Sequence, residues 1–130
     1  MMKRRVVVTG MGAVSPIGNT VEETWDGILN QVCGIDEITH FDTTDYKVKL
    51  AGEVKNLDLV QYFTKRELKF NDRFTQFARI VSKQAVENAK LDLESIDSQR
   101  FGVIIASGIG GVESIEKAEQ SLLNRGPSKV

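Results

Sequence analysis

Two apolar runs, each followed by a glycine-rich loop, constrain the fold of this chain more than any other feature. Residues 6–8 are valines at consecutive positions, a pattern typical of a strand covered on both faces of a parallel sheet. The chain then turns through Gly10 and Gly12, where a side chain would clash. A second run, residues 101–107, leads into another glycine loop and a helical segment. This repetition predicts an α/β fold with binding chemistry in the loops that follow the strands.

The first predicted helix follows the first glycine loop. Thr20 and Glu23 have the spacing of a capping box, and Gly34 is expected to end the helix. A weaker alternation in residues 48–54 predicts a short exposed strand or one arm of a hairpin.

Two further helices are predicted in the second half of the chain. Asn71 or Asp72 is placed to cap the longest one, whose apolar stripe includes alanines small enough for close approach to a neighbouring element. The last helix is expected to end at Gly126-Pro127. Two strong strands and one weak strand are few for an α/β sheet, which typically has about four to six.

Length and composition limit the classes of protein to consider. A chain of 130 residues is the size of one domain, so one core is expected. With 17 basic and 18 acidic residues, the nearly neutral chain favours neither nucleic acid nor a membrane surface as a partner. No apolar run reaches the length of a membrane span or a signal peptide, so a cytoplasmic protein is predicted. One cysteine and one histidine give no structural zinc pattern, and no metal is expected.

Both glycine loops allow more than one interpretation. The first resembles a dinucleotide-binding fingerprint, but the third glycine is missing and the helix starts too late to receive a phosphate, so a nucleotide-binding module is the weaker alternative. The second loop, at Gly108 and Ile109, lacks the lysine of a phosphate loop. It is either a tight strand-to-helix turn or a flexible loop that places Ile109 in the wall of an apolar pocket.

The remaining polar candidates are weak on their own. Cys33 follows the first helix, where neither a helix amino terminus nor a cation would activate a thiolate, and His40 has no partner in the sequence. Lys65, Arg66 and Lys69 gather positive charge on one turn. That cluster is either a solvated face or a dock for an acidic partner.

Many ordered motifs resemble the amino-terminal part of the β-ketoacyl-[acyl-carrier-protein] synthases, most closely the type II synthases of bacterial fatty-acid synthesis. The resemblance covers essentially the whole chain, so residues 1–130 are expected to be the amino-terminal, incomplete portion of one synthase domain. The matching stretches are residues 4–19, Trp25, Gly34-Ile35, residues 40–42, Ala51-Gly52, residues 72–78, residues 107–111 and Gly126-Pro127.

The resemblance implies a thiolase-like fold, with αβαβα layers in the whole enzyme and only part of the amino-terminal half in this chain. It also implies a homodimer without a cofactor that performs a decarboxylating condensation of an acyl thioester with malonyl-carrier protein. In the family a cysteine carries the acyl chain and two histidines assist. None of these three matches a residue of this chain, so neither Cys33 nor His40 inherits a catalytic role, and the 130-residue chain alone is expected to be inactive.

Two sets of residues do inherit a role from the resemblance. Gly108 and Ile109 match the family's acyl-pocket residues, which favours the pocket interpretation of the second loop. Lys65, Arg66 and Lys69 match a basic patch that docks the acidic acyl carrier protein, although the chain departs from the family pattern just after it, at residues 70–71. A catalytically silent relative of the chain-length-factor type remains the main alternative. In isolation the chain is expected to be poorly soluble or partly ordered, because strands would be left with unpaired edges.

Overall fold

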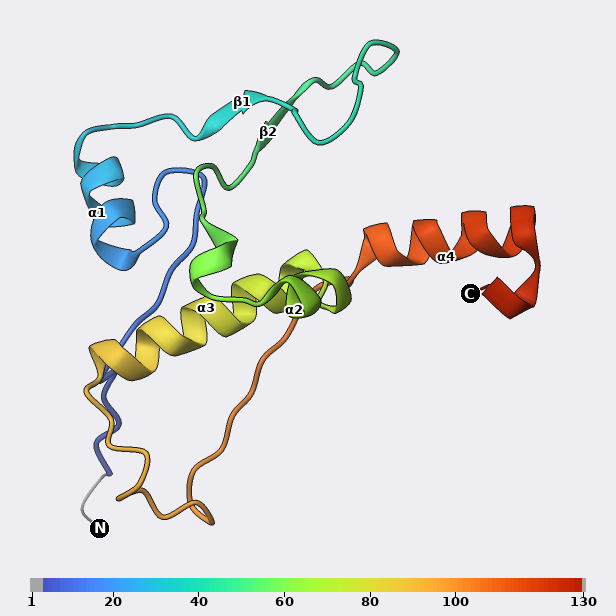
Figure 1. Ribbon diagram of the computed structural model, residues 1–130. Coiled ribbons are helices and arrows are strands. Elements are labelled where there is room, and N and C mark those ends of the chain that lie inside the picture. The colour runs from blue at the N-terminus through green and yellow to red at the C-terminus, as the bar shows by residue number, and fades with distance from the viewer. Residues whose placement is uncertain (1–3, 130) are drawn as a thin grey trace. The chain divides into compact units, whose positions relative to one another are not determined.

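The computed structural model describes residues 4–129, and its helices and strands follow one another in the order shown in Figure 1. The described residues form two compact units. The first unit comprises residues 4–58 and 80–94, and the second comprises residues 59–79 and 95–129. The sequence predicted one core, whereas each unit has its own most buried apolar side chain, Ile80 in the first and Phe63 in the second. The elements are α1 (Val21–Leu29), β1 (Ile35–Glu37), β2 (Leu50–Gly52), η1 (Leu59–Gln61), α2 (Lys65–Phe70), α3 (Arg73–Asn88), α4 (Val112–Arg125) and η2 (Pro127–Lys129).

The first helix, α1, begins where its capping residues predict. The Thr20 hydroxyl accepts a hydrogen bond from the Glu23 amide at 3.1 Å, which satisfies one of the free amides of the first turn. The Glu23 carboxylate reaches back to the amide of Asn19, at 2.7 Å, rather than to that of Thr20. The predicted end at Gly34 is wrong, because α1 already ends at Leu29. Gly34 instead lies so close to Pro16 that a Cβ atom would stand 2.7 Å from the proline Cβ.

The first glycine loop packs closely on α3. A Cβ atom at Gly10 would stand 2.6 Å from the Cβ of Ala89, the residue that follows α3, so the approach requires both a glycine in the loop and a small residue there. Polar side chains of α3 then bind the loop backbone. The Met11 amide donates to the Asn88 side chain at 3.1 Å, and the Ala13 amide donates to the Gln84 side chain at 2.9 Å. The alanines of this helix were predicted to permit close approach of a neighbouring helix or sheet, whereas the segment that approaches α3 here is the first glycine loop.

A short antiparallel ladder joins β1 to β2, with Asp36 opposite Ala51. The predicted hairpin arm in residues 48–54 is confirmed over the three residues of β2. Outside the ladder, the Lys55 ammonium group lies 2.7 Å from the Asp36 carboxylate. The Glu53 carboxylate accepts a hydrogen bond from the Thr39 hydroxyl at 2.7 Å.

The two strongest predicted strands, residues 6–8 and 101–107, are not strands in the structure. Both are extended segments, drawn as plain tube in Figure 1, and they belong to different units. A strand exists only where a neighbouring strand completes its hydrogen bonds, and within the described residues neither segment belongs to a ladder. Their side chains are consequently exposed, with Val6 at 95% and Ile104 at 96% of full accessibility.

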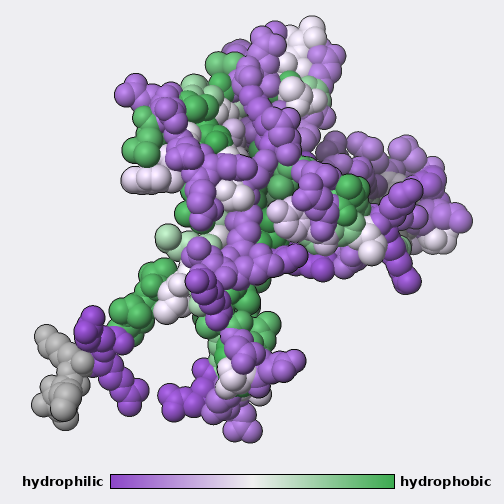
Figure 2. Space-filling view, turned by 60° about the vertical axis from the view of Figure 1, so that its left-hand side comes forward, coloured by the Kyte–Doolittle hydropathy of each residue, from purple (hydrophilic) through white to green (hydrophobic). Residues whose placement is uncertain are grey.

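Apolar side chains also remain at the surface elsewhere, as the green areas of Figure 2 show. On α1, Trp25, Ile28 and Leu29 are each more than half exposed, with Trp25 at 58%. In the second unit, Ile115 and Leu123 of α4 are exposed as well. The helix itself ends as predicted, because Gly126 takes a left-handed φ of 80° that favours glycine, and its amide bonds to the Leu122 carbonyl oxygen.

Candidate functional site

Both sets of predicted site residues lie in the second unit. Lys65, Arg66 and Lys69 all belong to α2, and all three side chains are exposed. Lys65 and Lys69 are one helical turn apart, so they project from neighbouring positions on the same side of the helix. The three cations are hereafter called the α2 cations, and they form a positively charged surface that an acidic partner can reach.

A capping box fixes the start of α2. The Thr64 hydroxyl accepts from the Glu67 amide at 3.3 Å, while the Glu67 carboxylate accepts from the Thr64 amide at 2.9 Å. The Thr64 hydroxyl also donates a hydrogen bond to the same carboxylate, at 3.0 Å. A helix of six residues is too short to be stable by itself, so these contacts decide where it begins.

A second set of contacts ties α2 to α3. Arg79 on α3 donates to the Glu67 carboxylate at 2.9 Å, and its guanidinium group lies 4.7 Å from the centre of the Phe63 ring. Phe63 is 5% exposed, so this stacking takes place against a buried ring. The hydrogen bond from the Thr64 amide, followed by that from Arg79, holds the pKa of Glu67 below its ordinary value. Glu67 is therefore charged at neutral pH and anchors α2 at both its start and its side.

The second glycine loop is anchored at its carboxyl end. The amide of Gly110 donates to the Ser107 hydroxyl at 3.0 Å, and Gly110 takes a φ of 85°. The Ser114 hydroxyl on α4 donates to the Asp72 carboxylate at the start of α3. That carboxylate fills the space where a Cβ atom of Gly111 would stand, so Gly111 allows α4 to approach this closely.

The predicted pocket residues themselves are free of such packing. A Cβ atom added at Gly108 would meet no heavy atom within 4 Å, and Ile109 is 79% exposed. The loop thus exposes the apolar side chain of Ile109 between Gly108, which has free space around its Cα atom, and Gly110, which has a left-handed φ. Any pocket around Ile109 needs walls other than those that the described residues supply.

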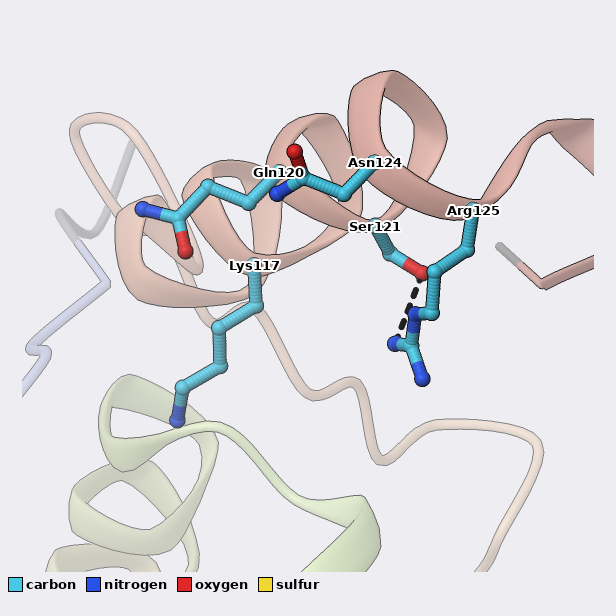
Figure 3. A pocket seen from close by; sticks show the side chains of 5 residues that line it. All are labelled: Lys117, Gln120, Ser121, Asn124 and Arg125. Atoms are coloured by element: carbon cyan, nitrogen blue, oxygen red, sulfur yellow. Dashed lines mark hydrogen bonds between the residues drawn. The ribbon is translucent and has the colours of Figure 1, made fainter.

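A shallow polar pocket lies along α4, and Figure 3 shows the side chains that line it. The Arg125 guanidinium group donates to the Ser121 hydroxyl at 2.9 Å, and this hydroxyl in turn donates to the Lys129 carbonyl oxygen at 2.7 Å. Lys117 pairs with Glu113, and this hydrogen bond raises the pKa of the lysine. Both cations of the pocket are thus engaged by side chains of α4 itself.

The sequence left Cys33 and His40 without a role, and both lie in the first unit. Cys33 is an exposed free thiol whose sulfur lies 3.7 Å from the Ile35 carbonyl oxygen. The His40 ring lies 3.9 Å from the Glu53 carboxylate. Among residues 4–129, no three acidic, histidine or cysteine side chains gather to hold a metal ion.

Sequence reasoning missed the residues that fix the site. The spacing of Thr64 and Glu67 is that of a capping box, and this signal could have identified Glu67 before the structure was known. Arg79 and Ser114 make contacts over long sequence separations, so no local pattern marks them. Within the described part of the chain, no helix is both long and apolar enough to cross a bilayer.

Comparison with known proteins adds the family. Residues 3–129 match the family model described as "Beta-ketoacyl synthase, N-terminal domain". The chain is 49% identical over 127 residues to a 3-oxoacyl-[acyl-carrier-protein] synthase 2 of Staphylococcus aureus, an alignment that covers 98% of this chain and 31% of the relative. It is 47% identical over 130 residues to the Vibrio cholerae synthase of the same name, with 100% and 31% covered. The chain thus spans about a third of the length of these relatives.

Solved structures agree with this match. The ishigamide ketosynthase/chain length factor superposes with a TM-score of 0.78 at 28% identity, over 96% of this chain and 31% of the other. A type II PKS acyl-carrier protein in complex with its ketosynthase, bound to the hexaketide, superposes with a TM-score of 0.77 at 23% identity, over 98% and 33%. The chain accordingly has a thiolase-like α/β fold over the part that it covers.

Proposed function

Because the chain belongs to the beta-ketoacyl synthase family through its N-terminal domain, we propose that it serves as the amino-terminal portion of a 3-oxoacyl-[acyl-carrier-protein] synthase. This enzyme, an acyltransferase of fatty acid biosynthesis, condenses an acyl thioester with malonyl-carrier protein and releases carbon dioxide. The observation that carries the proposal is the 49% identity to a synthase of that name over 98% of this chain. In this proposal residues 1–130 form part of one synthase domain.

The α2 cations are proposed to dock the acyl carrier protein. All three are exposed on a helix whose position is fixed by Thr64 and Arg79, so the surface is both accessible and ordered. A positive surface increases the rate of encounter with an acidic carrier and selects its orientation. A solved relative of this fold has a carrier protein in complex with its ketosynthase, which supports this choice of partner.

The Gly108-Ile109 loop is proposed to form part of the wall of the acyl pocket. An apolar side chain suits a fatty acyl chain, and burial of that chain against Ile109 removes apolar surface of both from water. Gly110, with its left-handed φ of 85°, lets the loop carry Ile109 without a bulky neighbour. The pocket is completed by other parts of the protein, because Ile109 is 79% exposed here.

The chemistry is assigned to groups outside these residues. Cys33 is an exposed free thiol, and its sulfur lies 3.7 Å from the Ile35 carbonyl oxygen, which is neither a cation nor a base strong enough to deprotonate it. A nucleophilic thiolate needs an adjacent base or cation, so Cys33 is proposed to be a bystander. The synthase is further proposed to be a cytoplasmic homodimer that needs no cofactor.

A second candidate function is that of a catalytically silent partner of a ketosynthase. It is favoured by one observation, the likeness to a structure that contains a chain length factor beside a ketosynthase. In that case the fold and the docking surface would persist without condensation.

One assay separates the two functions. The full-length protein is incubated with acyl-carrier thioester and malonyl-carrier protein, and the carrier products are identified by mass spectrometry. A synthase produces 3-oxoacyl-carrier protein, and its Cys33→Ser variant does so at an unchanged rate. Absence of product from a folded, pure protein would reject the synthase and favour the silent partner.

A further inference from the structure

We propose that Glu67 is a positioning residue for the carrier protein: it does not bind the partner, but holds α2 so that the α2 cations meet an acidic surface in a fixed orientation. The inference rests on the proposed function and identifies the residue that keeps the docking surface ordered. It concerns a residue that carries the opposite charge to the surface in which it lies.

The contacts of Glu67 link the start of α2 to α3. Its carboxylate accepts from the Thr64 amide at 2.9 Å, one residue before the helix, and from Arg79 at 2.9 Å, on α3. Arg79 also stacks on the ring of Phe63, at 4.7 Å, and this ring is 5% exposed. The carboxylate therefore connects the start of α2 to a buried part of the second unit.

The helix itself cannot supply this order. It has six residues, fewer than an isolated helix needs to be stable, and its far end at Phe70 is 74% exposed. The turn between α2 and α3 contributes one further bond, because the Gln76 side chain donates to the Asn71 carbonyl oxygen at 2.8 Å. Without the Glu67 carboxylate, the amide of residue 67 still donates to the Thr64 hydroxyl, but α2 loses the hydrogen bond to the Thr64 amide and the pair with Arg79.

A purely electrostatic role and a positioning role of Glu67 predict opposite changes in carrier affinity when the carboxylate is removed. A negative charge among the α2 cations repels an acidic partner, so its loss alone would strengthen docking. If Glu67 orders the helix, its loss lets the cations move and weakens docking despite the gain in net positive charge. The sign of the change in affinity therefore decides between a surface charge and a positioning residue.

The test compares Glu67→Ala with Glu119→Ala in the full-length protein. Glu119 is an exposed residue of α4 in the same unit. Both variants therefore lose one negative charge and gain a residue that favours helix. We expect Glu67→Ala to bind acyl carrier protein about fivefold more weakly, as loss of a capping contact would give, and Glu119→Ala to bind at least as tightly as the parent. Binding of Glu67→Ala that is unchanged or tighter would overturn the inference.

A second measurement excludes a general structural defect. In the acylation half-reaction, measured without malonyl-carrier protein, positioning for the carrier raises the KM for acyl-carrier thioester, while the KM and the rate of acylation with the carrier-free thioester acyl-coenzyme A stay unchanged. Equal losses with both substrates would show that Glu67 has only a structural role. If Glu67→Ala fails to fold, Glu67→Gln retains a capping oxygen but loses the charged pair with Arg79, and a smaller loss of carrier affinity is expected. Carrier affinity of a folded Glu67→Gln variant equal to or tighter than that of the parent would overturn the inference.

Failure of the docking proposal gives a different pattern. The double variant Lys65→Ala/Lys69→Ala removes two of the α2 cations without touching the contacts of Glu67. Unchanged carrier affinity in this variant would reject the docking surface and the inference together. Weakened affinity there, combined with unchanged affinity in Glu67→Ala, would reject the inference alone.

Discussion

Replacement of Gly12 by alanine tests whether the first glycine loop is held on α3 by close contact. A Cβ atom at this position would stand 2.9 Å from the carbonyl carbon of Val81 and 3.0 Å from the Cβ of Gln84, and closer still to the Val81 carbonyl oxygen. The Val81 atoms belong to the helix backbone, which cannot rotate away as a side chain can. The loop must therefore move off the helix.

The free energy of unfolding is expected to fall by about 2 to 4 kcal/mol. Overpacking of a close contact costs about 1 to 3 kcal/mol, and this contact is with backbone atoms. Displacement of the loop also stretches the 2.9 Å hydrogen bond from the Ala13 amide to Gln84, whose loss costs about 1 kcal/mol. The effect is large against a typical total stability of about 5 to 15 kcal/mol.

Urea unfolding of the full-length protein measures this change, and amide exchange of Ala13 localises it. Gly102→Ala is the matched control, because a Cβ atom there would meet no heavy atom within 4 Å. That control is expected to be neutral or to gain up to about 1 kcal/mol through the unfolded state. If the Gly12 and Gly102 variants unfold at the same urea concentration, or if Ala13 keeps its protection in Gly12→Ala, the close packing of the loop on α3 is refuted.

Three further predictions concern the pocket, the hairpin and the end of α4. Ile109→Phe is expected to lower kcat/KM for long acyl chains by about tenfold more than for short ones, because the larger ring narrows the pocket; an equal effect at all chain lengths would contradict the pocket role. The Thr39 hydroxyl holds the pKa of Glu53 below its ordinary value, so the stabilising contact is complete above the ordinary glutamate range and is lost as the pH falls through the lowered value. A fall in the protection factor of the Thr39 amide on acidification, taken relative to the intrinsic exchange rate at each pH, is the expected signature and is abolished by Glu53→Gln; a pH-independent protection factor in the parent would oppose it. Gly126→Ala is expected to destabilise the protein by about 1 kcal/mol, because its φ of 80° disfavours a side chain, and an unchanged thermal midpoint would argue against that strain.

The helices could be predicted because their signals are local. Thr20 marks the start of α1 and Gly126 ends α4, each through a contact or a backbone angle within a few residues. Asp72 immediately precedes α3, where its backbone carbonyl oxygen accepts from the Gln76 amide while its carboxylate accepts from Ser114. The end of α1 was mispredicted because Gly34 serves a tertiary contact with Pro16 instead of a helix end. A glycine has the same appearance in sequence whichever of these two roles it plays.

The strands could not be predicted from the same kind of signal. Valines at residues 6–8 show that the segment suits a covered strand, but a strand requires hydrogen bonds from a neighbour. In the described chain neither this segment nor residues 101–107 belongs to a ladder. The antiparallel pair that does form, β1 with β2, uses short segments with weak alternation, which a hairpin brings together.

The candidate site was predictable in its charges but not in its architecture. The positions of Lys65 and Lys69, one turn apart, could be read directly from the sequence. The contacts of Arg79 with Glu67 and with the Phe63 ring could not, because they depend on how α2 and α3 meet in space. Resemblance to a family identified Ile109, whereas local chemistry left its loop open to two interpretations.

The location of the acyl group on the full-length protein is the most direct test of the account. The protein is exposed to acyl-carrier thioester without malonyl-carrier protein, digested, and mapped by mass spectrometry for acylated cysteine. The account predicts a thioester on a cysteine other than Cys33, with the Cys33 peptide unmodified and acylation unchanged in Cys33→Ser. A thioester on Cys33, or 3-oxoacyl product made by the 130-residue chain alone, would contradict it.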